Sequence, residues 1–194
     1  MNFLAHIFLS GDNEKIRIGN FMADSIKGNK YLKYPPDIQK GIILHRGIDY
    51  FTDTHPVFRE STQRLSSRYG HYSGIIVDIF YDHFLAANWA EYSDIALERY
   101  VDNFYSLLKE NYEILPPKVK SFLPYMMRDN WLLSYAEIDG IKKVLNGMNK
   151  RTGSKSGMNE ATVELQKYYP EFALEFKRFF EDAQLFCKEK RRQL

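Results

Sequence analysis

The sequence predicts an all-α fold, with one compact multi-helix domain over residues 1–194. Three observations lead to this prediction. Apolar residues recur with the 3.6-residue period of amphipathic helices along most of the chain. The alternating pattern with Asn-Gly or Asp-Gly turns that is typical of β-hairpins is not found. Proline-containing breaks divide the chain into helix-sized segments.

Prolines mark where several of these helices begin. Pro35 and Pro36 precede one helix, Pro56 stands at the first position of another, and a Pro-Pro pair separates two more. Pro170 is a candidate break within the last helix. The polar segment 151–157 is the best linker, but only about 37 residues follow it, too few for a separate domain. The predicted helices cover 14–27, 37–53, 56–69, 72–91, 94–111, 117–129, 131–136, 138–148 and 158–188.

Composition excludes several classes of protein. Of the residues, 44% are hydrophobic and 27% are charged, as in ordinary globular domains. The single cysteine, Cys187, rules out a disulfide framework and suits a reducing compartment. The apolar stretch 75–89 is interrupted by two aspartates and a histidine, so we expect no transmembrane helix. The first six residues do not have the pattern of a signal peptide, so we expect a cytosolic protein that begins at Met1.

The charge is nearly balanced, with 27 Lys and Arg against 25 Asp and Glu, a net +2. Such a small excess does not indicate binding to nucleic acid. The basic residues are grouped, which fits either solvated faces or a docking surface for an acidic partner. The groups are Lys27, Lys30, Lys33 and Lys40, then Arg59, Arg64 and Arg68, and finally the tail 188–192.

The five histidines all lie in the first 83 residues, among several aspartates. These residue types are ligands for hard and borderline cations. In the predicted helix 37–53, His45 and Asp49 share the stripe that should face inward. A buried carboxylate needs a cationic partner. For Asp49 that partner is a metal ion, protonated His45 or Arg46. A purely structural role, in which Asp49 forms an internal ion pair that joins two helices, is as well supported as a metal site.

The predicted helix 72–91 is apolar around every side and should be buried. Asp78 and Asp82 stand one turn apart on one of its faces, and His83 projects about 100° away. Two adjacent buried carboxylates share a proton or bind a cation. This group is therefore a candidate metal or catalytic site, with structural salt bridges as the alternative.

Weaker candidates lie near the start of the chain and around two turns. Asn20 and Asp24 share one helix face, and His6 follows an apolar run that suits a core position equally well. His55 precedes a proline and fits a helix cap or a site residue equally well, whereas His71 follows a glycine and fits an exposed turn. The motifs of nucleotide-binding loops, HExxH zinc enzymes and GxSxG hydrolases are not found. Cys187, in a charged terminal helix, does not fit a thiol nucleophile, so metal-assisted hydrolysis is the remaining chemistry.

Five segments resemble the bacterial acyl carrier protein phosphodiesterases across essentially the whole chain. The segments 44–56 (LHRGIDYFTDTHP) and 78–85 (DIFYDHFL) are the specific ones. The others are 1–6, 19–24 and 131–136. The resemblance implies hydrolysis of the phosphodiester that joins 4′-phosphopantetheine to a serine of holo acyl carrier protein, with a divalent cation, typically Mn²⁺. It also implies an HD-domain-like fold, because the family is considered distantly related to the HD phosphohydrolases.

The residue roles that follow from this resemblance are expectations. The HD signature is His…His-Asp…Asp, and this chain has Asp82-His83 in the reverse order, which leaves open which residues replace the dyad. The expected metal ligands are His6, Asp24, His45 and Asp82. Asp49, Asp78 and His83 are expected to support the ligands or act as a catalytic base, and Arg46 to contact the phosphate.

Two other interpretations remain. A nucleotide or small phosphoester hydrolase would use the same metal site without needing a basic docking face. A helical interaction protein without catalysis would use the Asp and His residues as internal ion pairs. The resemblance favours the carrier protein phosphodiesterase, for which the basic clusters would attract an acidic carrier.

Overall fold

The computed structural model describes residues 2–194, and within them the only regular elements are helices. This confirms the predicted all-α class, whereas the domain limits 1–194 and the HD-domain likeness stay predictions. The α-helices are α1 (Phe3–Leu9), α2 (Glu14–Met22), α3 (Pro36–Thr54), α4 (Pro56–Tyr69), α5 (Ser73–Ala87), α6 (Leu97–Glu110), α7 (Pro117–Arg128), α8 (Trp131–Ser134), α9 (Ile138–Arg151), α10 (Thr162–Lys167) and α11 (Tyr169–Gln193). Short 3₁₀ turns include η1 (Ala23–Ser25), η2 (Gly28–Lys33) and η6 (Met158–Glu160).

Most helix boundaries agree with the prolines in the sequence. Helix α4 has the predicted limits, and α3, α4 and α7 each carry a proline in their first turn. The predicted helix 158–188 is divided into η6, α10 and α11, with the break just before Pro170. Helix α1 was not predicted. Helix α9 extends to Arg151, so the predicted linker begins inside a helix.

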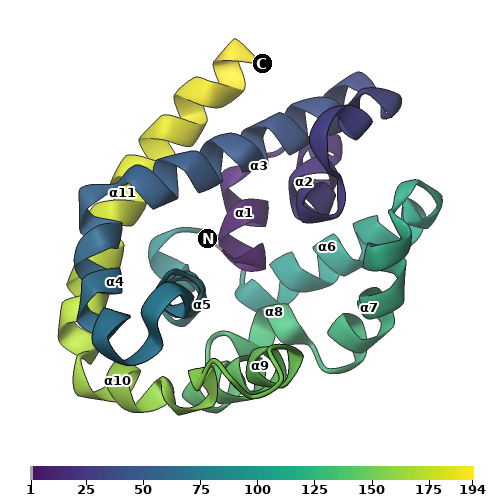
Figure 1. Cartoon of the computed structure of the whole chain (residues 1–194). Coiled ribbons are helices and arrows are strands. Elements are labelled where there is room, and N and C mark those ends of the chain that lie inside the picture. The colour runs from purple at the N-terminus through teal and green to yellow at the C-terminus, as the bar shows by residue number, and fades with distance from the viewer. Residues whose placement is uncertain (1) are drawn as a thin grey trace.

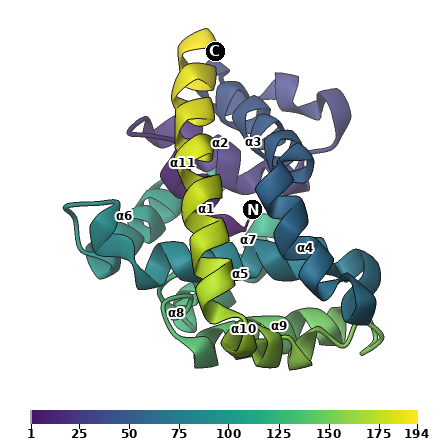
Figure 2. The ribbon, with the colours of Figure 1, turned by 90° about the vertical axis from the view of Figure 1, so that its left-hand side faces the viewer.

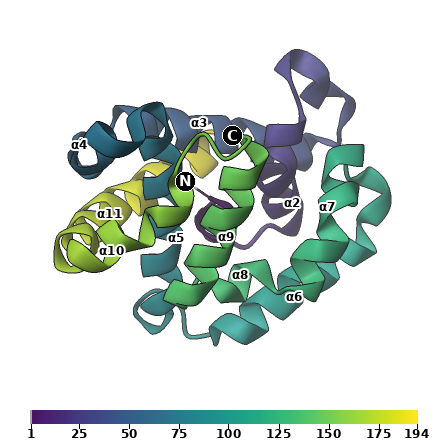
Figure 3. The ribbon, with the colours of Figure 1, turned by 60° about the horizontal axis from the view of Figure 1, so that its bottom comes forward.

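Helix α1 lies at the centre of the molecule, below α3 in Figure 1. It packs against α2, α5 and α11. The long helix α11 runs along one side of the molecule and crosses in front of the others in Figure 2, in contact with α3, α4 and α5. Helices α8 and α9 come forward in Figure 3, where the bottom of the molecule faces the viewer.

The core is rich in aromatic side chains between α5 and α11. Phe80 packs edge-on against Phe172, and Phe84 stacks on Phe176. Helix α5 is buried along most of its length, as its apolar residues on every side predict. None of the helices described is both long and apolar enough to cross a bilayer.

Two glycines bring α2 unusually close to α3. A Cβ atom on Gly41 would lie 2.2 Å from the carbonyl oxygen of Ile16, and one on Gly19 would lie 2.2 Å from that of Ile38. No side chain fits at such distances, so both positions need glycine. Because Asn20 follows Gly19 and His45 lies one turn after Gly41, this contact sets the distance between these two side chains.

Candidate metal centre

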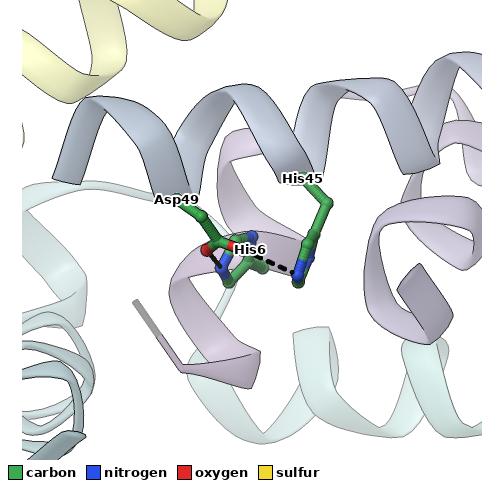
Figure 4. A group of neighbouring side chains, drawn as sticks. All are labelled: His6, His45 and Asp49. Carbon is green, nitrogen blue, oxygen red and sulfur yellow. Dashed lines mark ion pairs between the residues drawn. The ribbon is translucent and has the colours of Figure 1, made fainter. Parts of the chain in front are cut away.

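Three side chains from two helices converge between α1 and α3. His6 projects from α1, and His45 and Asp49 project from adjacent turns of α3 toward it (Figure 4). The Nε2 atom of His6 lies 3.2 Å from Asp49 Oδ1, and the Nε2 atom of His45 lies 3.1 Å from Asp49 Oδ2. The imidazole rings are stacked with their centres 4.1 Å apart. One ligand atom from each residue lies within 4.8 Å of the other two, a spacing that suits a shared metal ion.

Asn20 on α2 fixes how both imidazoles are oriented. Its side-chain amide donates hydrogen bonds to the carbonyl oxygen of His6 and to Ser10 Oγ, so its Oδ1 atom is left to accept. The Nδ1 atoms of His6 and His45 lie 2.9 and 3.0 Å from this oxygen. Both rings must therefore carry a proton on Nδ1, which directs both Nε2 atoms toward Asp49. Metal-ligating histidines are oriented by hydrogen bonds of this kind.

The cluster opens to solvent on the side of its carboxylates. Asn20 is fully buried and both histidines are nearly so, whereas the side chain of Asp49 is 42% exposed. Asp24 on η1 lies at the rim, 70% exposed, with Oδ1 3.1 Å from His45 Nε2. The cluster thus has buried imidazoles on one side and solvent-exposed carboxylates on the other.

The carboxylates and imidazoles shift one another's pKa values. Burial works against a charge on His45, but hydrogen bonds to Asp24 and Asp49 outweigh it and raise the pKa of His45 to about 9. Burial and the charge of His45 lower the pKa of His6 to about 4. Burial opposes the charge of Asp49 too, yet the hydrogen bond from His45 and the nearby imidazole of His6 hold its pKa well below the usual range. At neutral pH, His45 is therefore protonated and positively charged, whereas His6 is neutral.

The donor set fits a divalent cation. The Nε2 atom of His6 is buried and has no hydrogen-bond partner among the described residues, although Asp49 lies beside it. A buried nitrogen without such a partner is costly, and a cation between the three side chains would satisfy it. Two imidazoles with a carboxylate are common ligands of first-row divalent metals.

Asp82, which we expected to be a ligand, is not part of this cluster. It is fully buried on α5, where Oδ2 accepts a hydrogen bond of 2.8 Å from the backbone N–H of Leu4 and Oδ1 one of 3.1 Å from that of Ala5. These are free N–H groups of the first turn of α1, where a carboxylate is favourable. Burial nevertheless raises the pKa of Asp82 to about 7.

His83 and Asp78, the other two candidates on α5, also lie outside the converging group. The Nδ1 atom of His83 donates to the carbonyl oxygen of Tyr135 at 2.8 Å, and its Nε2 atom lies 3.0 Å from the hydroxyl of Tyr169. Burial lowers the pKa of His83. Asp78 is half-buried, and burial raises its pKa.

Arg46 turns away from the cluster. Its guanidinium donates hydrogen bonds to the carbonyl oxygens of Ile26 and Gly28, at 3.2 and 2.8 Å, and lies over the ring of Tyr31. Asp49 therefore takes its cationic partner from the histidines, one of the alternatives that the sequence left open. In this position Arg46 fastens the segment that carries η1 and η2 onto α3.

The remaining histidines serve other purposes. The ring of His55 accepts a hydrogen bond from the backbone N–H of Val57 and caps α4, which is one of the two alternatives that the sequence left open. His71 is exposed in a short 3₁₀ turn, as predicted. The importance of Asn20 was not predicted, because only its position on the face of Asp24 is visible in the sequence.

Comparison with known proteins gives a consistent result. A family model described as acyl carrier protein phosphodiesterase matches residues 1–183. Proteins named acyl carrier protein phosphodiesterase from Photorhabdus laumondii and Salmonella agona are each 32% identical over 181 residues, covering 93% of this chain and 91% and 94% of theirs. A protein of the same name from Escherichia coli is 32% identical over 185 residues, covering 93% of this chain and 94% of its own. No solved structure matches the chain.

Proposed function

The chain belongs to the acyl carrier protein phosphodiesterase family, and on this premise we propose that it hydrolyses the bond between 4′-phosphopantetheine and a serine of holo acyl carrier protein. The products are apo carrier and free 4′-phosphopantetheine. The observation that carries the proposal is the convergence of His6, His45 and Asp49 in a chain that matches the family over residues 1–183.

We assign His6, His45 and Asp49 as the ligands of a divalent cation, for which we propose Mn²⁺ because carboxylate oxygens line the open side of the cluster. When bound, such an ion withdraws charge from a phosphoryl oxygen and lowers the pKa of a water molecule. Asn20 holds both imidazoles with Nε2 available. This differs from the assignment suggested by the resemblance in two ways, since Asp49 replaces Asp82 and Asp24 is no longer a ligand.

Asp24 is placed to move a proton. Its exposed carboxylate borders the cluster, and the hydrogen bond from His45 lowers its pKa, so it is ionised at neutral pH. We assign it to accept a proton from the attacking water. The water oxygen binds to phosphorus, the bond from phosphorus to the serine oxygen breaks, and the serine hydroxyl regains a proton.

The basic residues beside the cluster fit an acidic protein substrate. Lys27, Lys30 and Lys33 are exposed around η2, immediately after Asp24, and form no ion pair among the described residues. Arg46 holds this segment to α3. We propose that this lysine-rich segment attracts the acidic carrier. We further propose that the protein acts in the cytosol, because a lone buried thiol such as that of Cys187 suits reducing conditions.

Incubation of the purified protein with holo carrier and Mn²⁺, followed by mass spectrometry, tests the proposal. We expect the carrier to lose the mass of the 4′-phosphopantetheine group. His45→Gln should abolish this loss together with metal binding, whereas His71→Gln, an exposed control, should be unaffected. If holo carrier stays intact while nucleotides or other small phosphoesters are cleaved, the protein is a small-molecule hydrolase instead.

A further inference from the structure

A cavity of about 430 Å³ lies between the start of α1, the helix that carries His6, and the helices α8 and α9. Its volume is in the range of small-molecule sites, roughly 300–1,000 Å³. Two stripes on α9 form one wall, Lys143, Gly147 and Arg151 at four-residue spacing and Val144 with Met148. Asn2, Phe3 and Trp131 are among the residues on the other sides.

The cavity and the metal centre share one face of α1. Phe3, the first residue of α1, lines the cavity and His6 is three residues further on the same helix, so their Cβ atoms lie about 5–6 Å apart. Asn2, the residue before α1, also lines the cavity. A ligand with its phosphate at His6 therefore needs to follow α1 for only one turn to reach the cavity.

The lining suits an extended ligand that alternates apolar and amide groups. Phe3 and Trp131 both pack against Phe122 and form an aromatic wall. Lys143 and Arg151 contribute N–H donors to the lining, and the carboxylate of Asp129, which also lines the cavity, attracts Lys143. The pantetheine arm has gem-dimethyl and methylene carbons between two amides. Its length, comparable with about four residues of extended chain or roughly 14 Å, exceeds one helical turn.

We propose that this cavity binds the pantetheine arm of the substrate while its phosphate lies at His6, His45 and Asp49. The inference rests on the proposed function and adds to it a second subsite that recognises the arm which stays on the phosphoryl group when the serine oxygen leaves. Apolar side chains of Val144, Met148 and Trp131 contact the methyl and methylene groups, and the donors of Lys143 and Arg151 face the amide carbonyls. Cleavage would then select phosphodiesters that carry an amide-containing arm.

Gly147 offers a variant that fills the cavity without disturbing the fold. A Cβ atom at this position would meet no atom within 4 Å, and glycine is a poor residue for the interior of α9. Gly147→Leu thus places a branched side chain in the stripe between Lys143 and Arg151. Gly74→Leu is the matched control, because Gly74 is also helical, has the same open surroundings and lies on α5, away from the cavity.

The decisive measurement is calorimetric titration of the metal-free proteins with free 4′-phosphopantetheine. We expect wild type and Gly74→Leu to bind it equally and Gly147→Leu to bind at least about tenfold more weakly. With holo carrier and Mn²⁺, Gly147→Leu should raise KM but leave hydrolysis of bis(p-nitrophenyl) phosphate unchanged. Equal binding by all three proteins, or no binding by wild type, would overturn the inference.

The same experiments separate this inference from the proposed function. If the wild type cleaves holo carrier and Gly147→Leu binds 4′-phosphopantetheine as well as the wild type, the proposed function holds and the cavity assignment is wrong. If Gly147→Leu weakens the binding of 4′-phosphopantetheine but the wild type leaves holo carrier intact, the cavity assignment holds and the proposed function is wrong.

Discussion

Asn20 should be as important for metal binding as the ligands themselves. The change Asn20→Leu keeps a branched side chain but removes the oxygen that faces Nδ1 of His6 and of His45 and the amide that donates to Ser10. Two imidazole N–H groups then lack their acceptor in a fully buried place. Each such group costs about 1–3 kcal/mol, so the free energy of unfolding should fall by about 2–6 kcal/mol.

The effect on the metal follows from the loss of orientation. Without the oxygen of Asn20, each ring can exchange its Nδ1 and Nε2 protons or rotate, and Nε2 no longer needs to face Asp49. Removal of such a hydrogen-bond partner typically weakens metal affinity about 10- to 100-fold. Asn20→Asp retains the acceptor for both rings and should fall between wild type and Asn20→Leu.

Titration with Mn²⁺ and urea denaturation would measure both quantities for the three proteins. Asn88→Leu is a suitable control, because its side chain makes one hydrogen bond at the exposed end of α5 and its loss should cost less than about 1 kcal/mol. Wild-type Mn²⁺ affinity in Asn20→Leu would refute the reasoning, since the rings would then be oriented by something other than Asn20.

Three further predictions concern the proton, the buried carboxylate and the basic segment. The raised pKa of His45, about 9, means that metal binding at pH 7 releases about one proton, so Mn²⁺ affinity should rise with pH up to about 9. Calorimetry in buffers of different protonation enthalpy would count the released protons. Metal binding without proton release would contradict the assignment of His45 as a ligand. Asp82→Asn should lower the free energy of unfolding by about 1–3 kcal/mol, because it weakens the hydrogen bonds to the first turn of α1, and should leave Mn²⁺ affinity within about threefold of wild type. Thermal unfolding and Mn²⁺ titration measure the two quantities. A loss of Mn²⁺ affinity at unchanged stability would show that Asp82 is a ligand. Lys30→Glu with Lys33→Glu should raise KM for holo carrier and flatten its increase with salt at nearly constant kcat, and a KM indifferent to both salt and charge would assign the lysines to a solvated face.

The arrangement of helices was largely predictable because prolines mark their ends. Pro36, Pro56 and Pro117 stand in the first turns of three helices, as expected from the restricted backbone of proline. Helix α1 could not be found in this way, since seven residues cover barely two turns and show no period. Its first turn depends on an acceptor distant in sequence, the carboxylate of Asp82.

The candidate site was predictable in its residue types and less so in their roles. His6, His45 and Asp24 were expected at the site, and they converge or border it. Asp49 has a more central position than expected, because periodicity places it on the face of His45 but does not reveal that α1 brings His6 against that face. Asn20 was only a weak candidate on the face of Asp24, since an amide that orients imidazoles looks like any polar residue on a helix.

The reversed Asp82-His83 pair illustrates the limit of reading a catalytic pair from sequence order. Adjacent residues on a helix diverge by about 100°, and here Asp82 binds the N–H groups of α1 while His83 binds the carbonyl of Tyr135. Because Asp82 fixes the first turn of α1, and His6 projects from the next turn, this carboxylate acts on the site through the helix that carries a ligand. The proposed metal centre between α1 and α3 therefore also depends on α5, through the hydrogen bonds that Asp82 accepts from the first turn of α1.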